Sequence, residues 1–261
     1  MLKRSLVFLY GIASYAVFFV TYLYAIGFVG NVFVPRSIDG PSDGDFVGSF
    51  LTDLALLAVF AIQHSVMARP AFKRWWTRFV PEPAERSTYV LFSSLALILL
   101  FAFWRPLGGL VWSIRDPFSV AMLYGLCGFG FLLVLVSTFL INHFDLFGLR
   151  QVWLYLIGKP YTHIGFRKPG PYKLVRHPLY VGWMFAFWAT PVMTLTHFVF
   201  ALATTAYILI AIQLEEHDLI QSLGQAYREY RKEVPALIPF TRRRASRPNV
   251  EAFSESWDHV P

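Results

Sequence analysis

Residues 170–183 read GPYKLVRHPLYVGW, and residues 215–219 read EEHDL. Two apolar segments lie between these runs, and the break around Pro191 separates them into a predicted helical hairpin. Polar clusters are costly in hydrocarbon, so they indicate function where they border apolar helices. The hairpin brings both clusters together at its open end. The sequence therefore predicts a site there, around which the rest of the chain is organised.

The composition predicts a membrane protein, because 56% of the 261 residues are hydrophobic and only 15% are charged. Four apolar segments precede the hairpin, and each is long enough, or nearly so, to cross a hydrocarbon core of ~30 Å as a helix. They cover residues 5–29, 46–67, 87–104 and 118–142. We expect an all-α fold, a polytopic transmembrane bundle of four spans plus a helical hairpin, with five or six membrane helices and a cytoplasmic C-terminal helix.

One domain is expected over residues 1–261, because the apolar segments use up most of the length. Its helical spans lie in residues 1–142, and residues 143–240 hold the cofactor-binding loop, the hairpin and the C-terminal helix. Residues 241–261 form a basic tail. The first arm of the hairpin, residues 178–193, would be only roughly 24 Å long as a helix, so the sequence leaves open whether the hairpin crosses the bilayer.

The net charge of +7 does not require a nucleic-acid partner. Lys and Arg gather in loops beside apolar segments, where the positive-inside rule accounts for them. The basic runs at 69–78 and 150–176 are therefore expected on the cytoplasmic side, together with both termini, and the loops at 31–45 and 105–116 outside. Membrane lipids are the expected surroundings, with the basic cluster 242–244 against anionic headgroups. The oligomeric state is left open.

The two ends of the hairpin carry opposite charges. Pro178 suits a first helical turn, so Arg176 and His177 would lie at a positive helix N-terminus that favours a carboxylate or phosphate. Taken alone, the Arg176–His177 run could equally be an anchor at the membrane interface. A single glutamate at a helix end would most simply mark where the helix leaves the membrane. With Glu215 and Glu216 facing it, the run predicts a zwitterionic pocket. Among nearby Tyr and Trp rings, S-adenosylmethionine fits, because it has a carboxylate, an ammonium, hydroxyls and a soft cation.

The run RHPLYVGW at 176–183, followed by the glutamate pair and by Gly224, Tyr227, Tyr230 and the Val-Pro pair at 234–235, resembles the isoprenylcysteine carboxyl methyltransferase and phospholipid methyltransferase superfamily. The resemblance implies S-adenosyl-L-methionine bound in the cytoplasmic half of the bundle. Together with Arg176 of the anion site, it implies as cofactor-binding residues Gly165, Phe166, Tyr172, His177, Pro178, Leu179, Tyr180, Glu215 and Glu216.

Three earlier stretches narrow the resemblance: QHSVMARP at 63–70, PEPAERSTY at 81–89 and NHFDLFGLRQV at 142–152. They resemble the bacterial methanethiol S-methyltransferase family. This implies an enzyme of the bacterial inner membrane that methylates a small volatile thiol, methanethiol, to dimethyl sulfide. A prenylated cysteine carboxylate or a lipid is the alternative substrate. A non-enzymatic membrane protein, similar to those associated with nitrogen-oxide reduction, is a third hypothesis that shares the His-Ser-x-x-Ala pattern.

A thiol substrate needs help to ionise, because even free Cys has a pKa near ~8.5 and the thiolate is the nucleophile. His64, near the cytoplasmic end of the second span, is the first candidate base, although it can also simply be hydrogen-bonded at a helix end. His143 is the rival, with Asp145 expected to orient it. Arg69 or Arg150 is a candidate thiolate stabiliser.

Two further hypotheses concern ionisable side chains in or near the spans. A metal could be held by His64, His143, His177 and Glu215, but no tight ligand spacing occurs and methyl transfer from a sulfonium needs no metal, so none is expected. Asp53 lies almost on the same helical face as His64, and the sequence leaves open whether it serves function or helix packing.

Overall fold

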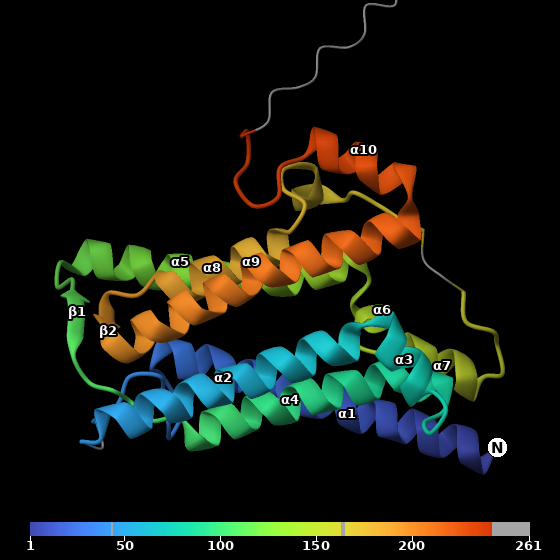
Figure 1. The fold of residues 1–261 in the computed structure, drawn as a ribbon, viewed down its shortest axis with the longest axis horizontal. Helices are drawn as coiled ribbons and strands as arrows, with labels where there is room; N and C mark the ends of the chain where they lie inside the picture. Colours follow the sequence, from blue (N-terminus) through green and yellow to red (C-terminus); the bar gives the residue numbers. More distant parts are fainter. Residues whose placement is uncertain (43, 163–164, 242–261) are drawn as a thin grey trace, which may run out of the picture.

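The computed structural model describes residues 1–42, 44–162 and 165–241, and the predicted basic cluster at 242–244 lies outside them. Two layers of three helices each run side by side along the longest axis of the molecule (Figure 1). One layer consists of α1 (Leu2–Gly30), α2 (Phe46–Ala68) and α4 (Glu85–Phe103). The other consists of α5 (Pro117–Ile141), α8 (Pro178–Trp188) and α9 (Leu195–Leu223).

Within the described residues, five helices are long and apolar enough to cross a membrane: α1, α2, α4 with the 3₁₀ turn η1 (Glu82–Ala84) before it, α5 and α9. The predicted all-α polytopic bundle is confirmed, and the chain is an integral membrane protein. Helix α8 has only 11 residues, fewer than the predicted 178–193. Helix α9 has 29 residues, roughly 43 Å, so its last turns extend beyond a ~30 Å hydrocarbon core.

The short elements gather at the two ends of the bundle (Figure 1). At the end that carries the N-terminus lie α3 (Pro70–Trp76), α6 (His143–Leu146), α7 (Leu149–Leu156), η2 (Gly170–Lys173) and α10 (Gln225–Glu233). At the opposite end, β1 (Leu110–Ser113) pairs antiparallel with β2 (Val192–Thr194), with Trp112 opposite Met193. These strands are absent from the sequence prediction. Because β1 belongs to the α4–α5 connector, its pairing shows that the hairpin reaches the far end of the bundle.

Aromatic packing fills the space between the layers. The Phe28 ring of α1 is fully buried and lies 5.8 Å from the ring of Trp104 and 6.4 Å from that of Phe200 in α9. The Tyr22 hydroxyl donates to the backbone oxygen of Phe131 in α5 at 2.7 Å. Aromatic rings of this size bury large apolar areas, and this burial holds the two layers together.

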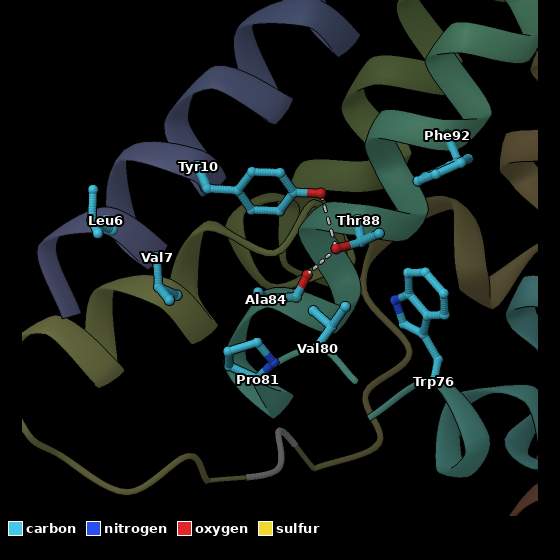
Figure 2. Close-up of a pocket in the computed structure, with 9 residues that line it drawn as sticks. All are labelled: Leu6, Val7, Tyr10, Trp76, Val80, Pro81, Ala84, Thr88 and Phe92. Atoms are coloured by element: carbon cyan, nitrogen blue, oxygen red, sulfur yellow. Dashed lines mark hydrogen bonds between the residues drawn. The ribbon is translucent and has the colours of Figure 1, made fainter. Parts of the chain in front are cut away.

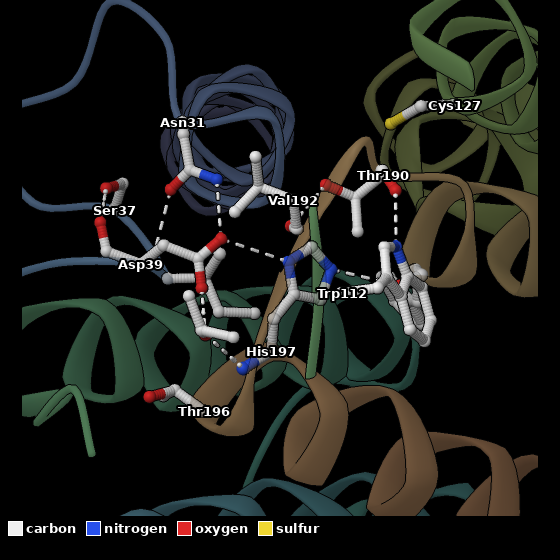
Figure 3. Close-up of polar contacts among 12 residues, drawn as sticks. Asn31, Ser37, Asp39, Trp112, Cys127, Thr190, Val192, Thr196 and His197 are labelled. Atoms are coloured by element: carbon white, nitrogen blue, oxygen red, sulfur yellow. Dashed lines mark hydrogen bonds and ion pairs between the residues drawn. The ribbon is translucent and has the colours of Figure 1, made fainter. Parts of the chain in front are cut away.

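A polar cluster ties the layers together at the β1–β2 end (Figure 3). Asp39, in the α1–α2 loop, accepts hydrogen bonds from Asn31 at 2.7 Å and from the Thr194 hydroxyl. Its Oδ2 lies 3.2 Å from Nδ1 of His197, and Nε2 of that ring lies 3.0 Å from the backbone oxygen of Phe187. The loop of the first layer is thereby joined to the start of α9.

Asp53 has a packing role in this arrangement. Its side chain is 1% exposed and accepts a hydrogen bond at 2.9 Å from the backbone N–H of Arg105, just beyond the end of α4. The structure therefore favours helix packing over a direct functional role for Asp53.

Asp39 should stabilise the fold in a pH-dependent way. Burial would raise the pKa of its carboxyl group, but hydrogen bonds from His197 and Thr194 outweigh burial and lower it below 3.8. A lowered pKa means that the stabilisation is present above the unfolded value and is lost as pH falls through the folded value. Asp39→Asn should cost about 1.5–3 kcal/mol of unfolding free energy at pH 7. Denaturation in detergent should show the difference in unfolding free energy between parent and variant narrowing below pH ~4. A difference that does not change with pH would show that the Asp39 charge is not the source of the stabilisation.

Two glycines allow α5 and α8 to cross backbone against backbone. A Cβ at Gly182 would lie 2.7 Å from the oxygen of Gly130 and 2.9 Å from the nitrogen of Val134. A Cβ at Gly130 would lie 2.5 Å from the nitrogen of Ala186. These neighbours are backbone atoms, so an added Cβ could be accommodated only if the two helices moved apart. The crossing fixes the position of α8 and hence of the polar run before it.

Gly182→Ala should therefore destabilise the protein by about 1–3 kcal/mol, the usual cost of overpacking. Gly128→Ala is the matched control in α5, because nothing lies within 4 Å of a Cβ there. Thermal unfolding in detergent measures both. An equal unfolding midpoint for the two variants would contradict the close crossing.

Candidate active site

A buried carboxylate holds three separate segments together at the N-terminal end of the bundle. Glu216 of α9 is 3% exposed, and its Oε1 lies 2.7 Å from Nε and 2.6 Å from Nη2 of Arg176. Nε2 of His177 lies 3.1 Å from the same oxygen, and Nε of Arg231 in α10 lies 3.0 Å from Oε2. A buried charge needs such partners to offset its desolvation. We call these four residues the Glu216 clamp.

Backbone contacts complete the clamp. The N–H groups of Arg176 and His177 donate to the oxygens of Pro235 and Ala236 at 2.8 and 3.1 Å. Nη1 of Arg176 also donates to the backbone oxygens of Arg231, at 3.1 Å, and Val234. Since Nε, Nη1 and Nη2 all have partners inside the chain, the geometry gives Arg176 a positioning role. Direct contact with a ligand anion, as expected from the sequence, remains a prediction.

Glu215 differs from its neighbour, because its side chain is 45% exposed. Its Oε2 accepts a hydrogen bond from the Tyr180 hydroxyl at 3.0 Å and lies 3.8 Å from Nδ1 of His177. Pro178 is buried at the first turn of α8, and Leu179 packs against the core between the layers. The predicted residues of this turn thus come together, and Glu215 is the carboxylate with capacity left for a ligand.

The loop before α8 packs against α10. The Phe166 ring lies 6.1 Å from the ring of Tyr227 and 5.4 Å from that of Tyr230, and Gly165 beside it is exposed. The Tyr230 hydroxyl donates at 2.6 Å to the backbone oxygen of Tyr172, which is buried. Burial raises the pKa of Tyr230 to about 12, so it stays a donor. The loop residues predicted from sequence therefore lie beside the Glu216 clamp.

Tyr227 adds a residue to this part of the site. It is 2% exposed, and its hydroxyl has no hydrogen-bond partner among the described residues. It lies close enough to Glu215 and Glu216 to interact with both electrostatically. Buried hydroxyls are normally paired, so this one fits a polar ligand group. The sequence signal for Tyr227 as a site residue was its place in the C-terminal motif, but the motif alone does not show that its hydroxyl is buried.

His64 of α2 lies in a second group of polar side chains, with partners from α4. Its Nδ1 is 3.2 Å from Oγ of Ser93, and the Tyr89 hydroxyl lies 2.8 Å from Nε2 and 3.1 Å from Nδ1. One turn earlier in α2, the Phe60 ring stacks on the imidazole at 5.2 Å. His64 is thus a hydrogen-bonded histidine in an aromatic setting.

Three tyrosines connect the two groups, and we call Tyr89, Tyr180 and Tyr207 the tyrosine cluster. The Tyr180 hydroxyl binds Glu215, and the ring of Tyr207 lies 6.3 Å from that of Phe60, which stacks on His64. Tyr207 of α9 also contacts Oγ of Ser65 in α2 at 3.0 Å. The cluster therefore bridges the two layers. Tyr89 and Tyr207 are not among the predicted site residues, although Tyr89 ends the quoted stretch at 81–89.

Positive charge surrounds this bridge. Nη1 of Arg69 lies 2.8 Å from Oδ2 of Asp218, in an ion pair that joins the end of α2 to α9. The Arg86 guanidinium lies 5.2 Å from the ring centre of Tyr89. Burial, with Arg86 nearby, lowers the pKa of the Lys73 ammonium. Nε of Arg69 donates at 3.2 Å to the backbone oxygen of Ser65, the residue after His64.

His143 is committed to packing. Its Nδ1 lies 2.8 Å from Oγ1 of Thr138, whose own hydrogen goes to the Leu135 oxygen at 2.6 Å, so Nδ1 is the donor. Burial lowers the pKa of the imidazole, and the neutral ring then accepts from the Tyr15 hydroxyl at 2.8 Å through Nε2. The expected orientation of His143 by Asp145 is wrong, because Tyr15 and Thr138 hold both ring nitrogens.

Arg150 is likewise engaged within its own loop. Its guanidinium lies 2.9 Å from Oδ1 of Asp145 and donates at 2.8 and 2.7 Å to the oxygens of Thr162. It also lies 5.2 Å from the ring centre of Tyr161. These contacts shape the α6–α7 region, and no contact with His64 or Glu215 is among them.

Two apolar pockets, of about 390 and 520 Å³, lie between α1 and α4 and include none of the predicted site residues. Figure 2 shows the first, lined by Leu6, Val7, Tyr10, Trp76, Val80, Pro81, Ala84, Thr88 and Phe92. Charged side chains are missing from both linings. The candidate site therefore consists of the polar groups around Glu215, Glu216 and His64 rather than these pockets. In the described part of the chain, no three His, Cys, Asp or Glu side chains gather as a metal site.

Sequence comparison with known proteins agrees with the resemblance seen in the motifs. A methanethiol S-methyltransferase of Crocosphaera subtropica is 56% identical over 239 residues, 92% of this chain and 94% of that protein. One of Mycobacterium tuberculosis is 53% identical over 242 residues, 93% and 99% of the two chains. This chain belongs to the methanethiol S-methyltransferase family. Nurim of Rattus norvegicus is a more distant relative, 29% identical over 196 residues, 72% and 74% of the two chains.

Membership of the methanethiol S-methyltransferase family confirms the resemblance and makes the chain an enzyme that transfers a methyl group from a donor. No family model and no solved structure matches the chain.

Glu216→Gln should destabilise the protein by about 3–5 kcal/mol, because it leaves the buried Arg176 guanidinium without its carboxylate. Glu215→Gln is the neighbouring control, and its half-exposed side chain should cost about 0–1 kcal/mol. Thermal unfolding in detergent separates the two. If both variants unfold at the parent midpoint, the Glu216 clamp does not hold the segments together.

Proposed function

We propose that this enzyme transfers a methyl group from S-adenosyl-L-methionine to methanethiol and releases dimethyl sulfide. The observation that carries the proposal is identity above 50%, over more than 90% of both chains, with proteins named methanethiol S-methyltransferase. The polar site adds chemical support, because it combines a half-exposed carboxylate, a buried hydroxyl that no described residue pairs with, and several tyrosine rings.

These groups fit the proposed donor. Glu215 has acceptor capacity for an ammonium or hydroxyls, and the Tyr227 hydroxyl can pair with a polar atom of the donor. Tyrosine faces favour a soft cation such as a sulfonium. Gly165, Phe166, Tyr172 and the residues from His177 to Tyr180 would shape the surrounding walls. In this proposal the Glu216 clamp, with Arg176, positions those walls and does not itself hold the donor.

When bound, S-adenosylmethionine supplies an electrophilic methyl group, so the protein has two tasks. It must hold the thiol sulfur in line with that methyl group, which lowers the entropic part of the barrier. It must also remove the thiol proton, since the thiolate is the nucleophile. His64 is the proposed base, and the Arg69 and Arg86 charges favour the developing thiolate.

We place the N-terminal end of the bundle on the cytoplasmic side of the bacterial inner membrane. The described parts of the basic runs at 69–78 and 150–176, which include α3 and α7, lie at this end, as the positive-inside rule requires. Residues 1–261 then form one catalytic domain whose donor site opens to the cytoplasm, where a donor made in the cell can enter.

The purified protein in detergent, given S-adenosylmethionine and methanethiol, should produce dimethyl sulfide detectable by gas chromatography. A prenylated cysteine and a phospholipid serve as competing acceptors in parallel reactions. Methylation of one of these without dimethyl sulfide would move the enzyme to a lipid substrate. No methylation of any acceptor would reject the proposal.

His64→Ala should lower turnover of the thiol by roughly 100-fold to 10,000-fold, because the base is lost. The loss should shrink as pH rises, since alkaline solution supplies thiolate without the imidazole. His143→Ala is the comparison, and it should lose stability and keep the catalytic step, because both nitrogens of His143 bind packing groups. A fast His64→Ala enzyme beside an inactive, folded His143→Ala enzyme would transfer the role of base to His143.

A further inference from the structure

The hydrogen bonds of His64 leave little room for a thiol at the imidazole itself. Nδ1 contacts Ser93 and Nε2 contacts the Tyr89 hydroxyl, and the Phe60 ring stacks against one face. A thiol that approached the ring nitrogens from the side of Tyr89 would meet its hydroxyl first, because that hydroxyl lies 2.8 Å from Nε2 and 3.1 Å from Nδ1. On this side the base would reach the substrate through an intermediary.

Tyr89 is placed to be that intermediary. It is the member of the tyrosine cluster whose hydroxyl contacts His64, whereas the Tyr180 hydroxyl binds Glu215 and the Tyr207 hydroxyl contacts Ser65. Tyr89 also lies within electrostatic range of Glu215 in the opposite layer. Tyr89 thus joins α4 to the base in α2, one residue from the contact that Ser65 of α2 makes with Tyr207 of α9.

The surroundings favour passage of a proton through this hydroxyl. Ser93 Oγ can accept from Nδ1–H of His64, which leaves Nε2 as the basic nitrogen of the ring, and the Tyr89 hydroxyl lies over the ring face, 2.8 Å from Nε2 and 3.1 Å from Nδ1. The Arg86 guanidinium lies over the Tyr89 ring and donates through Nε to the Leu146 oxygen at 2.7 Å. Its fixed positive charge stabilises negative charge that develops on the phenolic oxygen during transfer.

We propose that Tyr89 contacts the substrate thiol and relays its proton to His64. This inference rests on the proposed methyl transfer. The thiol S–H bond breaks and its proton passes to Tyr89 Oη, while the phenolic proton passes to Nε2 of His64. The sulfur electron pair forms the new bond to the methyl carbon, and the old methyl–sulfur bond breaks with its electron pair left on the donor. His64 then returns its extra proton to water.

Tyr89→Phe removes the hydroxyl and keeps the ring, so it tests the relay directly. It should lower kcat for methanethiol by roughly 100-fold, as expected for loss of acid–base catalysis. The residual rate should climb with pH, as in His64→Ala. Because the two residues act as one unit, the double variant His64→Ala with Tyr89→Phe should be no slower than the slower single variant.

Tyr22→Phe is the matched control. It removes another tyrosine hydroxyl from a membrane helix, one that binds a backbone oxygen between α1 and α5. It should keep the parent kcat. Two measurements independent of turnover check the fold of each variant: the midpoint of thermal unfolding, and the affinity for S-adenosylhomocysteine by calorimetry. Tyr89→Phe should match the parent in affinity.

Methaneselenol separates proton transfer from positioning, because this selenol is more acidic than the thiol and largely ionised at neutral pH. Tyr89→Phe should methylate it at close to the parent rate. An equal defect with selenol and thiol would reject the relay, as would a full-speed Tyr89→Phe enzyme with the thiol. A double variant slowed by the product of the single losses would also overturn it. Failure of the parent enzyme to methylate methanethiol would instead reject the proposed function.

Discussion

The buried carboxylate of Glu216 is the constraint on which the rest of the site depends. It lies at 3% exposure near the end of a membrane-spanning helix, and such a charge persists only if cationic partners surround it. Arg176 comes from the segment before α8 and Arg231 from α10, so satisfying one carboxylate fixes three segments. The positions of Arg176, His177 and the start of the loop after α10 relative to α9 follow from that requirement.

The two layers divide the proposed chemistry between them. The layer of α5, α8 and α9 carries the Glu216 clamp and Glu215, which we associate with the methyl donor. The layer of α1, α2 and α4 carries His64 and Tyr89, which we associate with the thiol. A reaction between two bound molecules needs both in one geometry, and the tyrosine cluster lies where the layers face each other. Glycine contact at the α5–α8 crossing and the Asp39 cluster at the far end keep that geometry fixed.

Much of the fold could be predicted from the sequence because hydrocarbon leaves few alternatives. An apolar run must satisfy its backbone hydrogen bonds internally, so it forms a helix, and each predicted span agrees with a helix to within a few residues. The pairing of β1 with β2 could not be predicted, since each strand is too short to show a pattern and they come from connectors about 80 residues apart. Pro191 indicated that α8 is short, but nothing in the sequence indicated that it ends at Trp188.

The sequence by itself determined the membrane class, the helices, the family and the polar residues of the hairpin, because these depend on composition and on motifs local in the chain. Only the tertiary structure decided what each polar residue does. Glu215 and Glu216 are adjacent and chemically identical, yet the rotation of α9 buries one among cations and leaves the other half exposed. His64 and His143 both look like bases in sequence, and only packing shows that His143 is held by Tyr15 and Thr138 while His64 meets Tyr89. Such differences arise from contacts across the bundle, which local sequence does not encode.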